Sequence, residues 1–286
     1  MVIVRINGGL GNQMFQYAMA KSFAKNRNDI FKMDISFYPK QTLRKYELNL
    51  FYVKEDIAAD KENIMLRGQE GLYYKIRKKL NIPLKRPSTY IRETLNFNIE
   101  KEVSYPKENI YLDGIWQNEK YFFNIRKELI SDFTPKIHLG TEAKSYIEEI
   151  QKKNSISLHV RRGDYIANDH TKSFHGVCNI EYYKKAIEYI VSNVPQPKFY
   201  IFSDDMQWCK KNFSFLENKV YVDKTANAIE DLELMKNCKH NIIANSTFSW
   251  WGAWLNNFNN KIVITPKIWW EAKPKQHIAP EKWIKL

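Results

Sequence analysis

The sequence is poor in cysteine and contains no long apolar run. Its three cysteines, Cys178, Cys209 and Cys238, form no Cys-x-x-Cys pair, and any disulfide would leave one of them over. This cysteine usage is typical of a reducing compartment, so we expect a cytoplasmic protein. No apolar stretch approaches the roughly 20 residues that span a bilayer. The N-terminus also lacks the basic and apolar regions of a signal peptide, so membrane-spanning and secreted proteins are not expected.

Acidic residues are fewer than basic ones, which gives the 286-residue chain a formal net charge of +13. Such a balance favours anionic partners: a phosphorylated ligand, an anionic membrane surface or nucleic acid. The basic residues are spread out, with local clusters at 75–86 and near the C-terminus. They form either a solvated surface or a patch for peripheral contact with the inner face of a membrane. No nucleic-acid-binding motif is recognisable, so nucleic acid is not expected as a partner.

The chain divides into two expected domains, 1–150 and 151–286, with a turn-rich stretch at 131–144 between them. The second is expected to be a doubly wound parallel sheet, because strands alternate with helices. By analogy with such folds we expect the strand order 3-2-1-4-5. The strand candidates are 155–160, 198–203, 219–222, 241–244 and 261–265, and the helical segments lie near 180–193, 206–213, 227–237 and 247–257.

The first domain is expected to be α/β but less regular. A strand at 2–6 leads through glycines into a helix over 12–26. A further strand is expected within 29–38, and 109–122 is expected to form a strand, a turn and then a helix capped by Asn118. The stretch 54–108 is weakly periodic and receives no assignment. The expected buried stripe of the first helix repeats every fourth residue: Phe15, Met19 and Phe23.

Three strands of the second domain end in polar residues that suit the parts of a nucleoside diphosphate. HVRRGDY (159–165) supplies Arg161 and Arg162, whose rigid forks of donors match phosphate oxygens. NSTFS (245–249) opens a helix, where hydroxyls, backbone N–H groups and the helix dipole can receive an anion. FSDD (202–205) offers a carboxylate that can accept two hydrogen bonds from guanine. Because the carboxyl ends of parallel strands share one edge, all three are expected to line one cleft.

Each of these clusters also has a plainer interpretation. Adjacent arginines are commonly surface charge, and Ser203-Asp204-Asp205 can simply cap a helix. NSTFS can likewise be an ordinary cap. Three tryptophans of the following helix are expected in the core between helix and sheet: Trp250, Trp251 and Trp254. The expected meeting of the clusters on one sheet edge favours the nucleotide site.

Four motifs taken together, GGLGNQMFQYA, HVRRGDY, FSDD and NSTFSWWGAWL, resemble the bacterial α-1,2-fucosyltransferases in their order and separations. The resemblance runs from Val4 to about Pro266. It implies an inverting enzyme of the GT-B type, with two Rossmann-like domains, that moves fucose from GDP-β-L-fucose to the 2-hydroxyl of a terminal galactose. The implied acceptor is a galactose-terminated oligosaccharide or lipid-linked glycan, in O-antigen or other surface-polysaccharide synthesis, held on the N-terminal side.

The resemblance also implies roles for single residues. Arg161 would hold the donor diphosphate, His159 would lie near the nucleotide, and Ser246 and Thr247 would complete the phosphate site. The full set of expected donor-binding residues is Asn12, Gln13, His159, Arg161, Arg162, Ser203, Asp204, Asp205, Asn245, Ser246 and Thr247.

The general base stays open among three candidates, Asp164, Asp169 and His170, of which Asp164 fits the motif but alternatively orients Arg161. No Asp-x-Asp motif, which in many transferases holds Mn²⁺ or Mg²⁺, occurs in the chain. His175 and Cys178 have a metal-like spacing but no second ligand pair. We therefore expect no metal and no cofactor, with Arg161 and a helix dipole stabilising the leaving group.

The first glycine loop raises a different possibility, a dinucleotide site. GGLGNQ lacks the third glycine of G-x-G-x-x-G, and Asp34 is the nearest acidic residue to end the following strand. We expect instead that this loop approaches the donor sugar, with Asn12 or Gln13 binding its hydroxyls. The alternatives left open are a nicotinamide-dependent oxidoreductase, a basic nucleic-acid-binding protein and a GT-B transferase that uses another nucleotide sugar.

Overall fold

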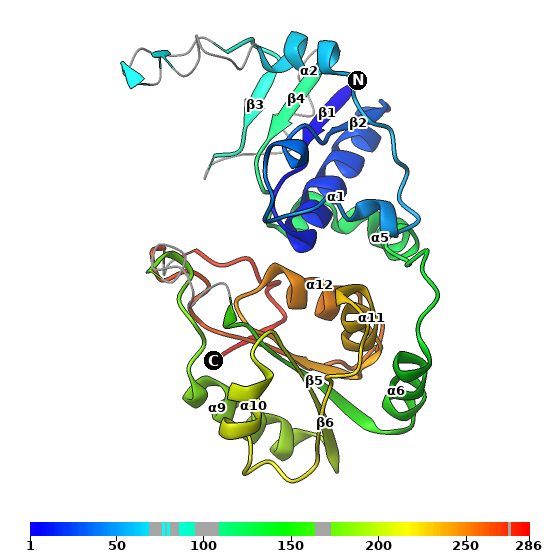
Figure 1. Cartoon of the computed structure of the whole chain (residues 1–286), viewed down its shortest axis with the longest axis vertical. Helices are drawn as coiled ribbons and strands as arrows, with labels where there is room; N and C mark the ends of the chain where they lie inside the picture. The colour runs from blue at the N-terminus through cyan, green and yellow to red at the C-terminus, as the bar shows by residue number, and fades with distance from the viewer. Residues whose placement is uncertain (69–75, 78, 81–85, 95–108, 164–172, 274–275) are drawn as a thin grey trace. The chain divides into compact units, whose positions relative to one another are not determined.

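Two parallel sheets organise the chain, and each belongs to its own unit (Figure 1). The computed structural model describes residues 1–68, 76–77, 79–80, 86–94, 109–163, 173–273 and 276–286. The units are Met1–Lys136 and Ile137–Leu286. The boundary expected after residue 150 falls inside helix α6 (Thr141–Lys152), whose Ile150 packs in the core of the second unit, so the division lies earlier in the chain.

Unit 1 contains a four-stranded sheet of order β2-β1-β4-β3, in which every pair is parallel. Its elements are β1 (Val2–Arg5), α1 (Leu10–Asn26), β2 (Phe31–Asp34), α2 (Asp60–Arg67), β3 (Tyr90–Arg92), β4 (Ile110–Asp113) and α5 (Arg126–Asp132). Short 3₁₀ turns lie at Tyr38–Lys40, Leu48–Leu50, Glu119–Tyr121 and Phe123–Ile125. The segment 109–122 thus forms the expected strand, but 3₁₀ turns stand where a helix was expected.

The helix α1 buries the predicted stripe, since Phe15, Met19 and Phe23 are fully inaccessible. The part of 54–108 that the structure describes supplies α2 and β3. An apolar cluster of Ile3, Leu66 and other residues joins α2 to the sheet. Apolar packing therefore accounts for elements whose periodicity was too weak to assign.

Unit 2 contains a six-stranded parallel sheet of order β10-β9-β8-β5-β6-β7. Numbered along the chain from β5, this is 3-2-1-4-5 with one further edge strand, so the expected order is confirmed. The strands are β5 (Asn154–Val160), β6 (Pro197–Ser203), β7 (Lys219–Tyr221), β8 (His240–Ile242), β9 (Val263–Thr265) and β10 (Ile284–Lys285). The helices after α6 are α9 (Ile180–Asn193), α10 (Met206–Asn212), α11 (Ala228–Asn237) and α12 (Thr247–Leu255).

Alternation along β6 shows why this sheet is covered on both faces. Phe199 and Ile201 pack into one apolar cluster, whereas Tyr200 and Phe202 pack into another. Such a strand reads as a continuous apolar run because neither face meets water. The tryptophans of α12 are buried, as expected for core residues. In the described part of the chain, no helix is long and apolar enough to cross a membrane.

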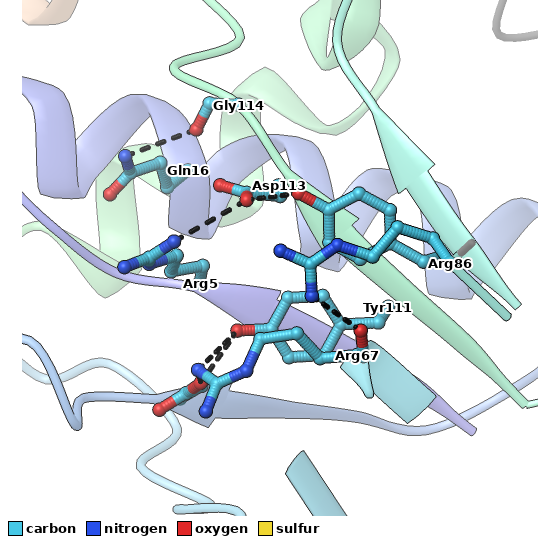
Figure 2. Close-up of polar contacts among 9 residues, drawn as sticks. Arg5, Gln16, Arg67, Arg86, Tyr111, Asp113 and Gly114 are labelled. Carbon is cyan, nitrogen blue, oxygen red and sulfur yellow. Dashed lines mark hydrogen bonds and ion pairs between the residues drawn. The ribbon is translucent and has the colours of Figure 1, made fainter. Parts of the chain in front are cut away.

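A buried ion pair closes one end of the unit 1 sheet (Figure 2). Arg67 Nη1 lies 2.7 Å from Asp34 Oδ2, and the Asp34 side chain is fully inaccessible. The Tyr111 hydroxyl donates to the same oxygen at 2.5 Å, and the Ser36 N–H donates to the other at 2.9 Å. Burial and the Asp34 charge raise the pKa of Tyr111 well above its usual range, so the hydroxyl remains a donor.

Replacing Arg67 by Met should strongly destabilise unit 1, because it leaves the buried Asp34 charge without its cation. We expect a loss of about 3–5 kcal/mol, measured by urea unfolding followed by circular dichroism. The double variant Asp34→Asn/Arg67→Met should lose less than Arg67→Met alone, since no buried charge is stranded. A single variant that is as stable as the wild type would show that this pair does not stabilise the unit.

Candidate functional site: the strand ends of unit 2

Asp204 joins the ends of β5 and β6. Val160 pairs with Ser203, which places Arg161 next to Asp204. Asp204 Oδ2 lies 3.1 Å from Arg161 Nε, and Oδ1 accepts the Arg162 N–H at 2.8 Å. A Cβ on Gly163 would lie 2.9 Å from Oδ2, so only glycine leaves room for this carboxylate. One side chain therefore fixes three successive residues of the HVRRG segment.

Arg162 is held by α10. Its Nε lies 3.4 Å from Asp205 Oδ2, and its guanidinium carbon lies 4.2 Å from the centroid of the Trp208 ring. The other Asp205 oxygen accepts the Trp208 N–H at 3.0 Å and caps α10, while Ser203 Oγ accepts the Asp205 N–H at 2.9 Å. Both arginines therefore pair with acids. Ser203 shapes the turn into α10, and its expected role in donor binding stays a prediction.

His159 is buried at the end of β5. Burial, followed by the nearby Arg161 charge, lowers the pKa of His159 to about 3. The imidazole is therefore neutral at physiological pH, with one ring nitrogen as donor and the other as acceptor. Its Nδ1 has no hydrogen-bond partner within the described ranges. The ring lies 6.0 Å from the Phe248 ring, so the end of β5 meets the first turn of α12.

The N-terminus of α12 has no side-chain cap. Ser246 stands at the cap position, its side chain makes no capping hydrogen bond, and no acidic residue lies in the first turn. By contrast, Asn179, Asp205 and Asn227 cap α9, α10 and α11. Uncapped N–H groups and the positive end of the dipole suit an anion. At this helix start Ser246 is buried and Thr247 half-buried, and their role in a phosphate site stays a prediction.

The side chain of Asn245 makes hydrogen bonds within the protein. Its amide donates to the His175 carbonyl at 2.8 Å, and its Oδ1 lies 3.4 Å from Cys178 Sγ. It therefore positions the chain ahead of α12, and its expected role in donor binding stays a prediction. Burial raises the pKa of Cys178 to about 11, so it remains a thiol. Within the described segments, no group of three histidine, cysteine or acidic residues gathers as metal ligands.

The glycine loop of unit 1 is tied by the amide of Gln13. This fully buried side chain donates to the Lys45 carbonyl at 2.8 Å and accepts the Glu47 N–H at 2.9 Å. Its expected role in binding sugar stays a prediction. Asn12 Oδ1 accepts from Gln117 Nε2 at 2.9 Å. Asp34, needed for a dinucleotide site, is instead closed inside its ion pair, so the structure does not favour a nicotinamide site here.

The three base candidates, Asp164, Asp169 and His170, lie outside the described residues. Sequence reasoning missed three residues that organise the site: Gly163, Trp208 and Phe248. The signal for Trp208 was its place three residues after a potential helix cap. Gly163 and Phe248 depend on contacts between separate strand ends, which no local pattern reveals.

Asp204→Ala should weaken GDP binding by about tenfold or more, because Arg161 and the Arg162 N–H both lose their partner. Asp205→Ala is the matched variant, and it should mainly lower stability by about 1 kcal/mol through the lost cap. Calorimetric titration with GDP and ADP measures both affinity and base preference. A narrower GDP-to-ADP ratio in either variant would assign that carboxylate to guanine. Unchanged GDP affinity and ratio in folded Asp204→Ala would contradict its role.

The whole chain, residues 1–286, matches the model of glycosyl transferase family 11. It is 35% identical over 295 residues to an α-1,2-colitosyltransferase of Escherichia coli, covering 100% of this chain and 98% of the relative. It is 34% identical over 309 residues to the O-antigen biosynthesis glycosyltransferase WbnK of Escherichia coli, covering 98% and 99% of the two chains.

A solved structure supports the same fold. A variant of Arabidopsis thaliana FUT1 in complex with GDP matches with a TM-score of 0.50 at 11% identity, over 92% of this chain and 69% of that one. The expected α/β fold with two Rossmann-like units is thereby confirmed, and so is the family expected from the motifs. The chain belongs to glycosyl transferase family 11.

Proposed function

We propose that this protein transfers fucose from GDP-β-L-fucose to the 2-hydroxyl of a terminal galactose, forming an α-1,2 linkage with inversion. The observation that carries the proposal is the arrangement at the end of β5. Arg161 follows β5, and the neighbouring strand β8 leads into the uncapped start of α12. Unit 2 would hold the donor and unit 1 the acceptor. Family membership and the name of the O-antigen relative support a role in surface-polysaccharide synthesis.

The leaving group explains why an arginine and a helix start are needed together. As the bond between fucose C1 and the phosphate oxygen breaks, negative charge grows on the β-phosphate of GDP. The Arg161 fork and the N–H groups of α12 stabilise that charge without reorganising. The galactose hydroxyl attacks C1 from the face opposite GDP, which converts a β-linked donor into an α-linked product. Its proton passes to a base, for which Asp164, Asp169 and His170 remain the candidates.

The base of the nucleotide would be read beside His159. The neutral imidazole presents Nδ1 without a partner among the described residues, and a buried polar nitrogen of this kind favours a polar ligand atom. Asp204 or Asp205 would add the carboxylate that suits guanine. The relative named as a colitosyltransferase supports a second donor sugar, so a colitosyl donor belongs beside GDP-fucose in the assay. Nuclear magnetic resonance of the product identifies the linkage.

We propose a cytoplasmic protein that makes peripheral contact with an anionic membrane. The net charge of +13 and the three free, buried cysteines support this location. Cosedimentation with vesicles that contain anionic lipid, compared with neutral vesicles, tests the contact. Binding to both vesicle types alike, or to neither, would contradict it.

Arg161→Ala should lower kcat/KM for GDP-fucose by about 10²–10³, equivalent to roughly 3–4 kcal/mol, because a preorganised partner of the leaving group is lost. Arg161→Lys keeps the charge but loses the fork, so it should also be severely impaired. Arg162→Ala is the neighbouring control and should be less affected, since Arg162 packs on Trp208. Steady-state kinetics with saturating acceptor and a circular dichroism check provide the measurement. A folded Arg161→Ala enzyme that keeps more than about a third of the wild-type value would show that the phosphate site is misplaced.

Removing divalent metal should leave turnover nearly unchanged, because arginine and helix N–H groups take the role that a metal has in other transferases. Rates in EDTA should lie within about twofold of those with Mg²⁺ or Mn²⁺. Near-complete loss in EDTA, restored by adding metal, would contradict the proposed mechanism.

A further inference from the structure

The carboxyl end of the unit 1 sheet carries a row of charges that alternates in sign from strand to strand. Arg5 at the end of β1 pairs in register with Asp34 at the end of β2. On the other side, Asp113 at the end of β4 pairs with Arg92 at the end of β3. Arg5 Nη1 and Asp113 Oδ2, at the ends of the two central strands, are 3.4 Å apart. The row therefore crosses all four strands.

The two carboxylates in this row have different surroundings. Asp34 is inaccessible and closed by Arg67 and Tyr111. Asp113 keeps 18% of its side chain accessible. Its Oδ2 accepts from the Tyr90 hydroxyl at 2.5 Å and lies near Arg5, whereas its Oδ1 accepts no hydrogen bond in the described part of the chain (Figure 2). Asp113 thus retains an acceptor oxygen that can bind a ligand hydroxyl.

Tyr90 is held rigidly in place. Its ring stacks on Tyr111 with centroids 5.9 Å apart and planes 15° from parallel, and the Arg86 guanidinium carbon lies 4.6 Å from its centroid. Burial, together with the hydrogen bond and charge of Asp113, raises the pKa of Tyr90, so the hydroxyl donates at neutral pH. Fixed partners on one oxygen leave the Asp113 carboxylate with a fixed direction.

The position in the sheet suits a ligand. In the order β2-β1-β4-β3, the chain adds β2 on one side of β1 and places β3 and β4 on the other side, so the strand order switches between the parallel strands β1 and β4. Ligands of open α/β sheets bind outside the carboxyl ends of the strands at such a switch point. Gln16 of α1 ties the two loops at this point, because it accepts the Asn7 N–H at 2.9 Å and donates to the Gly114 carbonyl at 3.1 Å. Figure 2 shows Gln16 and Gly114 beside the Arg5–Asp113 pair.

The hydrogen-bonding groups of this row indicate which of the two substrates, the donor or the acceptor sugar, binds here. A sugar hydroxyl is both donor and acceptor, and here a guanidinium and a carboxylate stand side by side to meet both needs. We propose that Arg5, Asp113 and Tyr90 form a subsite for the acceptor sugar, in which Asp113 Oδ1 accepts a hydrogen bond from a hydroxyl of the galactoside. This inference rests on the proposed function and names the residues of unit 1 that serve it.

The test is Asp113→Asn in the full chain, with lactose as the probe. Asp132→Asn is a matched control, because Asp132 on α5 also accepts a tyrosine hydroxyl and a cation, from Tyr17 at 2.9 Å and Lys21 at 2.5 Å. Its side chain is 16% accessible, close to that of Asp113. Three quantities are measured for each variant: KM for lactose, GDP-fucose hydrolysis without acceptor, and GDP affinity.

Asp113→Asn should raise KM for lactose by about tenfold or more and leave GDP-fucose hydrolysis and GDP affinity unchanged. Asp132→Asn should change none of the three. If Asp113→Asn fails to fold, Tyr90→Phe answers the question: it keeps the stacked ring, removes one partner of Asp113, and should raise KM for lactose several-fold.

Unchanged KM for lactose in folded Asp113→Asn, or an equal loss of GDP binding and transfer, would overturn the inference. A wild-type enzyme that hydrolyses GDP-fucose but accepts neither lactose nor N-acetyllactosamine would overturn the galactoside subsite and leave the donor site standing. A wild-type protein that neither binds GDP nor consumes GDP-fucose would instead overturn the proposed function, and the inference with it.

Discussion

The carboxylate of Asp204 is the contact on which the donor end of unit 2 depends. Two neighbouring strands, β5 and β6, end beside each other, and each would otherwise leave its polar residues to move independently. Asp204 binds the Arg161 guanidinium with one oxygen and the Arg162 backbone with the other. Gly163 then supplies the space that the carboxylate needs. A catalytic arginine is useful only if its fork is in place before the reaction, and this contact places it.

The charged residues at the carboxyl ends of the two sheets differ in their exposure to solvent. In unit 2 the acids hold arginines in partly exposed pairs. In unit 1 the Asp34–Arg67 pair is sealed from water, and only the Asp113 end remains accessible. The two units therefore differ in which charged residues remain accessible at the ends of their sheets.

The regular parts of this fold were predictable from the sequence, and the reasons are local. Alternating strands and helices predicted the sheet order of unit 2, and the stripe of α1 predicted its buried face. The two-residue strand β10 and the elements within 54–108 are too short or too polar to give a periodic signal. They form because apolar residues far apart in the sequence pack together, as Leu66 of α2 packs with Ile3 of β1.

The site was predictable in part. Arg161, His159 and the start of α12 come together as the motifs indicated. Gln13 and Asn245 could not be classified, because an amide that binds backbone 32 or 70 residues away looks, in sequence, the same as one that binds a ligand. The Asp113–Tyr90 contact was missed for a related reason: it depends on strand register, which separated segments do not encode locally.

The tryptophans of α12 bind this helix to the last part of the chain. Trp250 donates from its indole nitrogen to the Ile278 carbonyl at 3.1 Å, and its ring lies 5.5 Å from that of Trp283, next to β10. During synthesis a chain emerges from its N-terminus, and domains fold in that order. The described strands of unit 1 are complete once β4 has emerged, whereas the contacts of Trp250 with Ile278 and Trp283 form only after residues 278–283 are made. A ribosome-bound chain can therefore assemble the sheet of its first unit before the packing of α12 in its second unit is complete.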